Sequence, residues 1–281
     1  MPTERAELHV DDPEVGDLVL DAEIAGADDG DPVLLLHGWP QTSLSWSRVM
    51  APLASSGMLV VAVDQRGYSP GARPQEVSAY ATEHLVSDAL GVLDALGWES
   101  AHVVGHDWGA IVAWELAARH PAHVRSLTAL SVPHPRAFAH ALSTDDVQRS
   151  KSAYLQFFRA DPAKAAPVLL ADDASALRQV YGDDVHQHDV ELYVEHFSEE
   201  GALEASLRWY AAMGRMDTPD VHVPTTYLWG VDDIAIGEVA AHGCAQFCTG
   251  PYELRALEGR GHWLPDQDPD AVVDAILARV G

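Results

Sequence analysis

The segment Gly105-His106-Asp107-Trp108-Gly109 holds the residue best suited to covalent chemistry. The form Gly-x-nucleophile-x-Gly is typical of a strained turn between a buried strand and a helix, which presents its central side chain to substrate. Here that side chain is the Asp107 carboxylate, which the start of the following helix would keep ionised. Attack by a carboxylate on an ester gives an anhydride, whereas attack on saturated carbon gives an alkyl ester that water can open. The motif therefore predicts substitution at carbon.

A second segment, His37-Gly38-Trp39-Pro40, follows the apolar run at 33–36 and supplies backbone donors for this chemistry. We expect the backbone N–H groups of Trp39 and Trp108 to bind the non-attacking oxygen of Asp107. The same groups would then bind the oxyanion that forms when water attacks the ester. Taken alone, each segment is also compatible with a glycine-rich turn without a catalytic role.

Hydrolysis of the ester needs a general base, and His262 is the strongest candidate among fifteen histidines. It lies between the last strand-like run and the last helix, which suits the chain order nucleophile, acid, histidine. A carboxylate must hold its tautomer, and the loop after the apolar run at 225–229 offers Asp232 and Asp233. Asp233 fits the spacing Trp-Gly-x-x-Asp and is the expected partner.

These residues require a scaffold that brings the ends of several strands together. Short apolar runs alternate with helical patterns, which is typical of an α/β fold with a mostly parallel sheet covered by helices on both faces. We expect the first two strands to be antiparallel and linked as a hairpin. The expected strands are 6–10, 18–25, 33–36, 59–63, 101–104, 126–130, 225–229 and 252–257, and the expected core helices are 44–54, 82–96, 110–120 and 268–280.

The alternation stops between about Pro135 and Pro219, where helical patterns occur without a convincing strand. A block of helices that interrupts an α/β pattern predicts a helical cap inserted after one strand. We therefore expect a core of residues 1–134 and 220–281 and a cap of residues 135–219. The expected cap helices are 145–158, 174–181, 190–197 and 202–213.

Together these segments resemble the epoxide hydrolases of the α/β-hydrolase superfamily, over nearly the whole chain. The resemblance rests on the segments at 37–40, 64–69 (Asp-Gln-Arg-Gly-Tyr-Ser) and 105–109, the acid loop at 230–233, and Gly261-His262-Trp263. It implies the α/β-hydrolase fold with an inserted cap, and the opening of an epoxide to a vicinal diol without a cofactor. The first four segments also occur, with variations, in haloalkane dehalogenases, so the cap must discriminate between the two activities.

Epoxide hydrolases of this family carry two cap tyrosines that bind the epoxide oxygen. The resemblance implies this role for Tyr154, in Ser-Ala-Tyr-Leu-Gln-Phe-Phe, and for Tyr210, in Arg-Trp-Tyr, where Arg208 replaces a common Asn. Ring opening releases a strongly basic alkoxide, and a phenol with a pKa near ~10 can donate a proton to it. Tyr181 and Tyr193 lie in the same region and are the alternatives.

Two other functions compete with this one. A haloalkane dehalogenase would use the same Asp107 and would bind the leaving halide with the indole N–H groups of Trp39 and Trp108. It would not need the tyrosine pair, because halide leaves as a weak base. A non-catalytic binding protein on the same fold is disfavoured, because an unused nucleophile, acid and base would have no reason to be complete.

Composition excludes several other classes. With 17 Lys and Arg against 43 Asp and Glu, the net charge of −26 opposes binding to nucleic acid or to an anionic membrane. No secretion signal or membrane-length apolar run occurs, so we expect a cytoplasmic protein. The spacing of Cys244 and Cys248 predicts two free buried thiols on consecutive turns of one helix. We expect no metal site, a small apolar epoxide and water as partners, and leave homo-oligomerisation open.

Overall fold

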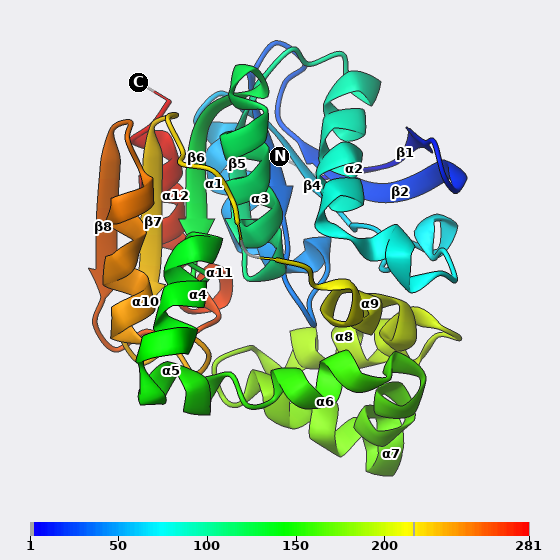
Figure 1. Cartoon of the computed structure of the whole chain (residues 1–281). Coiled ribbons are helices and arrows are strands. Elements are labelled where there is room, and N and C mark those ends of the chain that lie inside the picture. Colours follow the sequence, from blue (N-terminus) through cyan, green and yellow to red (C-terminus); the bar gives the residue numbers. More distant parts are fainter. Residues whose placement is uncertain (1–2, 216, 281) are drawn as a thin grey trace.

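The computed structural model describes residues 3–215 and 217–280, which form one mixed sheet with helices around it (Figure 1). Residues 1, 2, 216 and 281 fall in the predicted core and cap ranges but lie outside the described residues. The strand order is β1-β2-β4-β3-β5-β6-β7-β8; β2 is antiparallel to β1 and β4, and the later pairs are parallel. The strands are β1 (Glu4–Asp12), β2 (Gly16–Ala25), β3 (Asp31–Leu36), β4 (Met58–Val63), β5 (Ala101–His106), β6 (Val124–Leu130), β7 (Thr225–Gly230) and β8 (Tyr252–Leu257).

Helices cover both faces of the sheet because the central strands are apolar on both sides. Leu34 and Leu36 of β3 belong to the core beneath α2 and α3, whereas Val33 and Leu35 belong to the core beneath α1 and α12. The predicted mostly parallel sheet, covered by helices on both faces, is confirmed. The helices of the core are α1 (Ser47–Ser55), α2 (Thr82–Ala95), α3 (Trp108–Arg119), α10 (Glu238–Gly243), α11 (Leu264–Gln267) and α12 (Pro269–Leu277).

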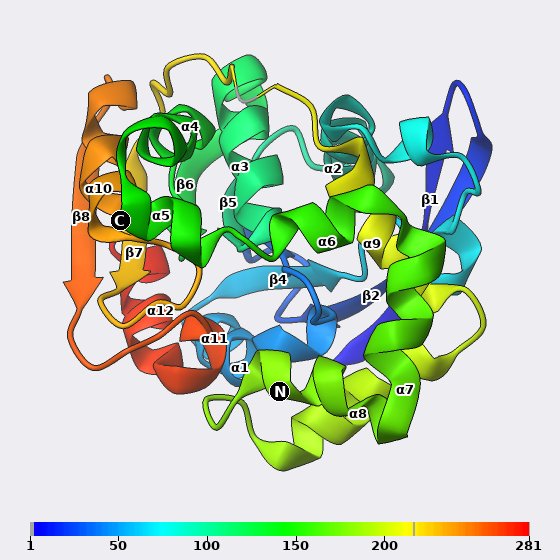
Figure 2. The same cartoon turned by 60° about the horizontal axis from the view of Figure 1, so that its bottom comes forward.

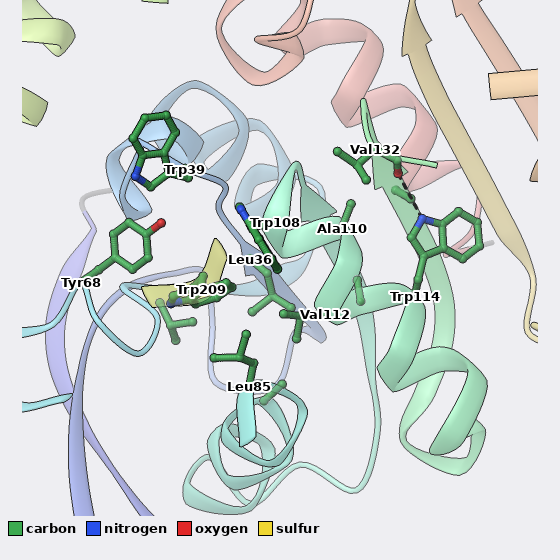
Figure 3. Packing of buried hydrophobic residues seen from close by; sticks show 14 of the residues in the cluster. Leu36, Trp39, Tyr68, Leu85, Trp108, Ala110, Val112, Trp114, Val132 and Trp209 are labelled. Carbon is green, nitrogen blue, oxygen red and sulfur yellow. Dashed lines mark hydrogen bonds between the residues drawn. The ribbon is translucent and has the colours of Figure 1, made fainter. Parts of the chain in front are cut away.

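Aromatic side chains hold α3 in place at the centre of the core. The indole N–H of Trp114 donates to the carbonyl of Val132, just beyond β6, at 3.1 Å (Figure 3). The Trp108 ring meets that of Trp209 edge-on, with centroids 5.5 Å apart, and Tyr68 meets Trp209 at 5.9 Å. The start of α3 is thereby packed against a helix that follows far later in the chain.

In the described part of the chain, a run of six helices separates β6 from β7 and lies at the carboxyl end of the parallel strands (Figure 1). Figure 2, with this end turned forward, shows α6, α7, α8 and α9 grouped beside α4 and α5. Among the described residues, no helix is both long and apolar enough to cross a membrane. The six helices are α4 (Pro135–Thr144), α5 (Asp146–Lys151), α6 (Leu155–Ala160), α7 (Pro162–Tyr181), α8 (Gln187–Ser198) and α9 (Ala202–Ala212).

The structure corrects several predicted helices. The helix expected at 145–158 is split into α5 and α6, because α5 is tied to the loop after β7 through Gln148 whereas α6 packs against α9. The helix expected at 174–181 is the second half of α7, whose backbone breaks at 171–174. Helix α4 was not predicted; Pro135 stands at its first position and the His134 side chain caps it.

The two cysteines also differ from the prediction. Cys244 is buried and opens a short 3₁₀ helix, η5 (Cys244–Phe247), whereas Cys248 follows in extended backbone and is only partly buried. The backbone of Cys248 pairs with that of Val221 in an isolated parallel β-bridge, so Cys248 lies outside the helix. Both thiols are free, as expected.

Arg66, in the 64–69 segment, links three parts of the core through buried ion pairs. The buried Arg66 guanidinium donates to Asp12 at 2.6 Å and to both oxygens of Asp88 at 2.6 and 2.7 Å. It thereby joins β1, α2 and the loop after β4. Burial raises the pKa of the Asp12 carboxyl, but the Arg66 hydrogen bond, two backbone N–H groups and the Arg66 charge outweigh burial and hold that pKa below its ordinary value.

Replacing Arg66 with Met is expected to lower the free energy of unfolding by about 3–5 kcal/mol at neutral pH, because two buried carboxylates lose their partner. In the wild type, the stabilisation from Asp12 is present above its unfolded pKa, near 3.8, and is lost as the pH falls further. In the variant the stranded carboxylates become protonated more readily, so the difference between the proteins should shrink in acid. Urea unfolding at neutral and mildly acid pH measures this. Arg5→Met, at an exposed pair with Glu23, should change stability by less than about 1 kcal/mol; equal losses in both variants would contradict the prediction.

Candidate active site

Asp107 occupies a strained turn between β5 and α3. Its φ is 51° and its ψ is −116°, a conformation that costs a non-glycine residue on the order of 1–3 kcal/mol. The flanking glycines let three elements approach each other. A Cβ on Gly105 would lie 2.2 Å from the carbonyl oxygen of Gly109, and one on Gly109 would lie 2.0 Å from that of Leu36. The tight packing of β3, β5 and α3 therefore requires both glycines.

The loop after β3 holds one oxygen of this carboxylate. The Trp39 backbone N–H donates to Asp107 Oδ1 at 2.9 Å, and the Trp108 backbone N–H is among the groups that lower the pKa of this carboxyl. A Cβ on Gly38 would lie 2.3 Å from Asp107 Cβ, so only glycine permits this approach. His37 is buried and shapes the loop; its Nδ1 donates to the Gly38 carbonyl at 3.0 Å. The second carboxylate oxygen, Oδ2, is not bound by the Trp39 amide.

The loop before α11 places His262 beside Asp107. His262 Nε2 lies 3.4 Å from Asp107 Oδ2, and its Nδ1 lies 2.9 Å from Asp233 Oδ2. The other Asp233 oxygen, Oδ1, accepts the backbone N–H groups of Ala235 at 2.7 Å and Ile236 at 3.0 Å. Asp233 is fully buried, whereas Asp232 is exposed. The structure thus brings together the nucleophile, acid and histidine candidates that the sequence selected.

Burial and charge set the protonation of these groups. Burial lowers the pKa of His262, but the carboxylates of Asp233 and Asp107 outweigh it and raise the pKa to about 10. Burial raises the pKa of Asp107, but hydrogen bonding and charge from His262 outweigh it, so the net shift is downward. His106 is different: burial lowers its pKa to about 4, and its neutral ring donates to the His262 carbonyl at 2.9 Å. Ser131 donates to the same carbonyl at 2.6 Å.

Two cavities meet at the nucleophile and share four lining residues, of which Ala235 belongs to the loop after β7. Asp107, Tyr154 and Tyr210 line both, and one, of about 220 Å³, also reaches His262. Tyr154 lies at the start of α6 and is 38% exposed, whereas Tyr210 of α9 is buried. The two rings have centroids 6.4 Å apart. Burial and the charge of Asp107 raise the pKa of both phenols, so each stays protonated and able to donate.

The alternative tyrosines lie elsewhere. Tyr181 and Tyr193 stack on each other with centroids 5.5 Å apart. The Tyr181 hydroxyl donates to the Pro40 carbonyl, and the Tyr193 hydroxyl lies 3.4 Å from the side-chain nitrogen of Gln41. Neither lines the two cavities at Asp107. They support the loop that carries Trp39.

The two tryptophans present their indoles to the cap. The Trp39 indole N–H donates to Ser206 Oγ of α9 at 3.1 Å. The Trp108 ring meets Tyr210 edge-on with centroids 5.1 Å apart. The Trp39 indole donor therefore has a partner in the cap, and the Trp108 ring packs against a cap tyrosine.

Sequence reasoning missed two residues at this site. Lys151 lines the larger cavity and its Nζ donates to the Asp233 carbonyl, while Gln148 bonds the Ala235 carbonyl at 2.7 Å. No motif surrounds either residue. The one feature of the sequence that distinguishes Lys151 is the rarity of lysine, which occurs only at Lys151 and Lys164.

Comparison with known proteins identifies the family of this chain. The family model described as the alpha/beta hydrolase fold matches residues 31–269, and the chain belongs to that family. The AB hydrolase superfamily protein YfhM of Bacillus subtilis is 30% identical over 92% of this chain and 93% of its own length. Epoxide hydrolase A of Mycobacterium tuberculosis is 30% identical over 90% of this chain and 92% of its own length.

Solved structures of epoxide hydrolases are also similar to this chain. One, described under novel epoxide hydrolases in metagenomes from hot environments, has a TM-score of 0.87 and 26% identity. It covers 100% of this chain, and this chain covers 99% of it. Within the α/β-hydrolases, this chain groups with the epoxide hydrolases.

Proposed function

We propose that this protein hydrolyses epoxides to vicinal diols through an alkyl ester on Asp107. The observation that carries the proposal is the arrangement around this carboxylate. One oxygen is bound by a backbone N–H, an imidazole–carboxylate pair stands beside it, and two protonated phenols line the cavity with it. The relatives named epoxide hydrolases support the same chemistry.

In the first step, Asp107 Oδ2 attacks an epoxide carbon and the carbon–oxygen bond of the ring breaks. The electron pair passes to the ring oxygen, which would be a strong base as an alkoxide. Tyr154 and Tyr210 bind this oxygen and supply its proton. The product of the step is a hydroxyalkyl ester of Asp107.

In the second step, His262 takes a proton from water, and the water oxygen attacks the ester carbonyl carbon. The backbone N–H groups of Trp39 and Trp108 bind the oxyanion, whose collapse breaks the bond between the carbonyl carbon and the diol oxygen. That oxygen takes the proton held by His262, and the diol leaves Asp107 as a carboxylate. Esterification removes the charge of Asp107, which is one cause of the raised pKa of His262. The pKa of His262 therefore falls once the ester has formed. The imidazolium then gives up its proton, which passes through solvent to the tyrosinate left by the first step, and neutral His262 acts as the base in the second step.

The substrate class follows from the cavity. Its walls include Trp39, Phe158, Val180 and Ile234, which suit a small apolar epoxide. Residues 135–219 act as the cap over this cavity, and residues 1–134 and 220–281 as the core. The dehalogenase alternative needs the Trp39 indole for halide, but that N–H donates to Ser206.

A panel of epoxides and haloalkanes tests the proposal directly. With styrene oxide, cyclohexene oxide and bromobutane, we expect diol from epoxides and no halide above the uncatalysed rate. Chromatography measures the diol and ion chromatography the bromide. Halide release without diol formation would replace the proposed activity with dehalogenation, and the absence of both would favour a binding protein.

Substitution of the cap tyrosines is a second test that distinguishes epoxide hydrolysis from dehalogenation. Tyr154→Phe and Tyr210→Phe should each slow ester formation, and the double variant should slow it by about 10²–10⁴-fold, because the alkoxide loses both proton donors. Stopped-flow tryptophan fluorescence follows the step, since Trp108 adjoins the nucleophile. Tyr252→Phe, on β8 outside the site, is the control. A double variant that forms the ester at the wild-type rate would exclude this role.

A further inference from the structure

The loop that carries Asp233 is held by helix α5. Residues 233–237 (the acid loop) contain neither helix nor strand. Three hydrogen bonds join the acid loop to α5: Lys151 Nζ donates to the Asp233 carbonyl, Gln148 Nε2 donates to the Ala235 carbonyl at 2.7 Å, and the Gly237 N–H donates to Gln148 Oε1 at 2.8 Å. Gln148 is fully buried in this contact. Figure 1 shows α5 beside the end of β7 from which the loop emerges.

The orientation of the Asp233 carboxylate depends on the acid loop. Its Oδ1 accepts the N–H groups of Ala235 and Ile236, and this leaves Oδ2 aimed at His262. A shift of the loop backbone would therefore turn the carboxylate away from the imidazole. The bond from Lys151 is charge-assisted, and such bonds are about twice as strong as neutral ones.

Helix α5 also leads directly to the cap tyrosine. Lys151 is its last residue, and Tyr154 precedes α6 by one position. Lys151, Tyr154 and His262 line the same cavity. The segment from α5 to Tyr154 thus contacts the acid loop and also supplies a proton donor to the cavity wall.

We propose that Lys151, supported by Gln148, is a positioning residue that fixes the acid loop so that Asp233 meets His262. This inference rests on the proposed function and adds a residue to it. Lys151 acts through the backbone of Asp233 and takes no part in bond making. Its contribution falls on the second step, because ester formation uses Asp107, the backbone amides and the tyrosines, whereas ester hydrolysis needs the oriented His262–Asp233 pair.

The test is a comparison of Lys151→Met with Lys151→Arg, using styrene oxide under single-turnover conditions. Met keeps the length of the side chain and loses the donor, whereas Arg keeps a donor. We expect ester hydrolysis to slow by about 10–100-fold in the Met variant, the loss that a misplacement of about 1 Å produces. Ester formation should stay within about twofold of the wild type, so acid-quenched samples should show accumulated protein–substrate adduct by intact mass. The Arg variant should recover most of the hydrolysis rate.

Lys164→Met is the matched control, because the only other lysine of the chain lies exposed on α7 beside Asp161. A purely structural role for Lys151 would slow both steps together, since a disturbed cap displaces Tyr154 as well. Equal slowing of both steps, unchanged hydrolysis in the Met variant, or no recovery with Arg would each overturn the inference. A wild-type protein that forms no ester from any epoxide would instead overturn the proposed function, and the inference with it.

Discussion

Asp107→Ala is expected to lose diol formation by about 10⁴-fold or more, as found when the nucleophile of a covalent hydrolase is removed. The variant has no carboxylate to form the ester, while Trp39, His262 and the tyrosines remain in place. The fold should be retained, because the Asp107 side chain lines the substrate cavity and its hydrogen bond to Trp39 joins two loops of the site, not two strands of the sheet. Chromatographic diol assay and circular dichroism measure the two properties. Diol formation near the wild-type rate would exclude Asp107 as nucleophile.

Isotope labelling examines the same step in the wild-type protein. In a single turnover in ¹⁸O-water, the diol should take its new oxygen from Asp107 and remain largely unlabelled. The label should enter the Asp107 carboxylate, where peptide mass spectrometry detects it. Label found directly in the first diol would mean that water attacks the epoxide without an ester.

His262→Gln is expected to form the ester but not to break it. Loss of a general base costs on the order of 10²–10⁴-fold, and here the loss falls on hydrolysis because Asp107 attacks without proton transfer to the histidine. Intact mass after mixing with an epoxide should show the protein plus one substrate molecule, followed by very slow decay. His9→Gln, at an exposed histidine paired with Asp17, should turn over like the wild type. Steady turnover by His262→Gln without an adduct would assign the base to another residue.

The pH dependence of the two steps should differ. Before ester formation, two carboxylates raise the pKa of His262 to about 10, so the imidazolium persists through neutral pH. After ester formation one of these charges is gone, and the pKa that governs hydrolysis lies lower. The pKa of His262 in the resting protein should therefore lie above the pKa seen in the rate of ester hydrolysis. The difference between these two pKa values measures the effect of the charge lost from Asp107.

Features that depend on neighbouring residues could be predicted from the amino-acid sequence. The positive φ of Asp107 and the close approach of β3, β5 and α3 follow from Gly105 and Gly109, which lie in the same short segment. Apolar runs of strand length, separated by helical patterns, likewise identified the parallel sheet. The order nucleophile, acid, histidine then selected Asp233 and His262, because the carboxyl ends of parallel strands meet at one edge.

Which cap residues face the nucleophile depends on how the cap helices pack against the core. Tyr154 and Tyr210 line the cavity with Asp107, whereas Tyr181 and Tyr193 stack under the Trp39 loop, although all four lie in helical patterns of similar composition. The partner of the Trp39 indole is Ser206, far along the chain. The contact between Lys151 and the Asp233 carbonyl joins segments that no motif relates. Local steric limits follow from residues that are adjacent in the sequence. These contacts instead depend on how the helices of 135–219 pack against the sheet, and that packing depends on the burial of many side chains together.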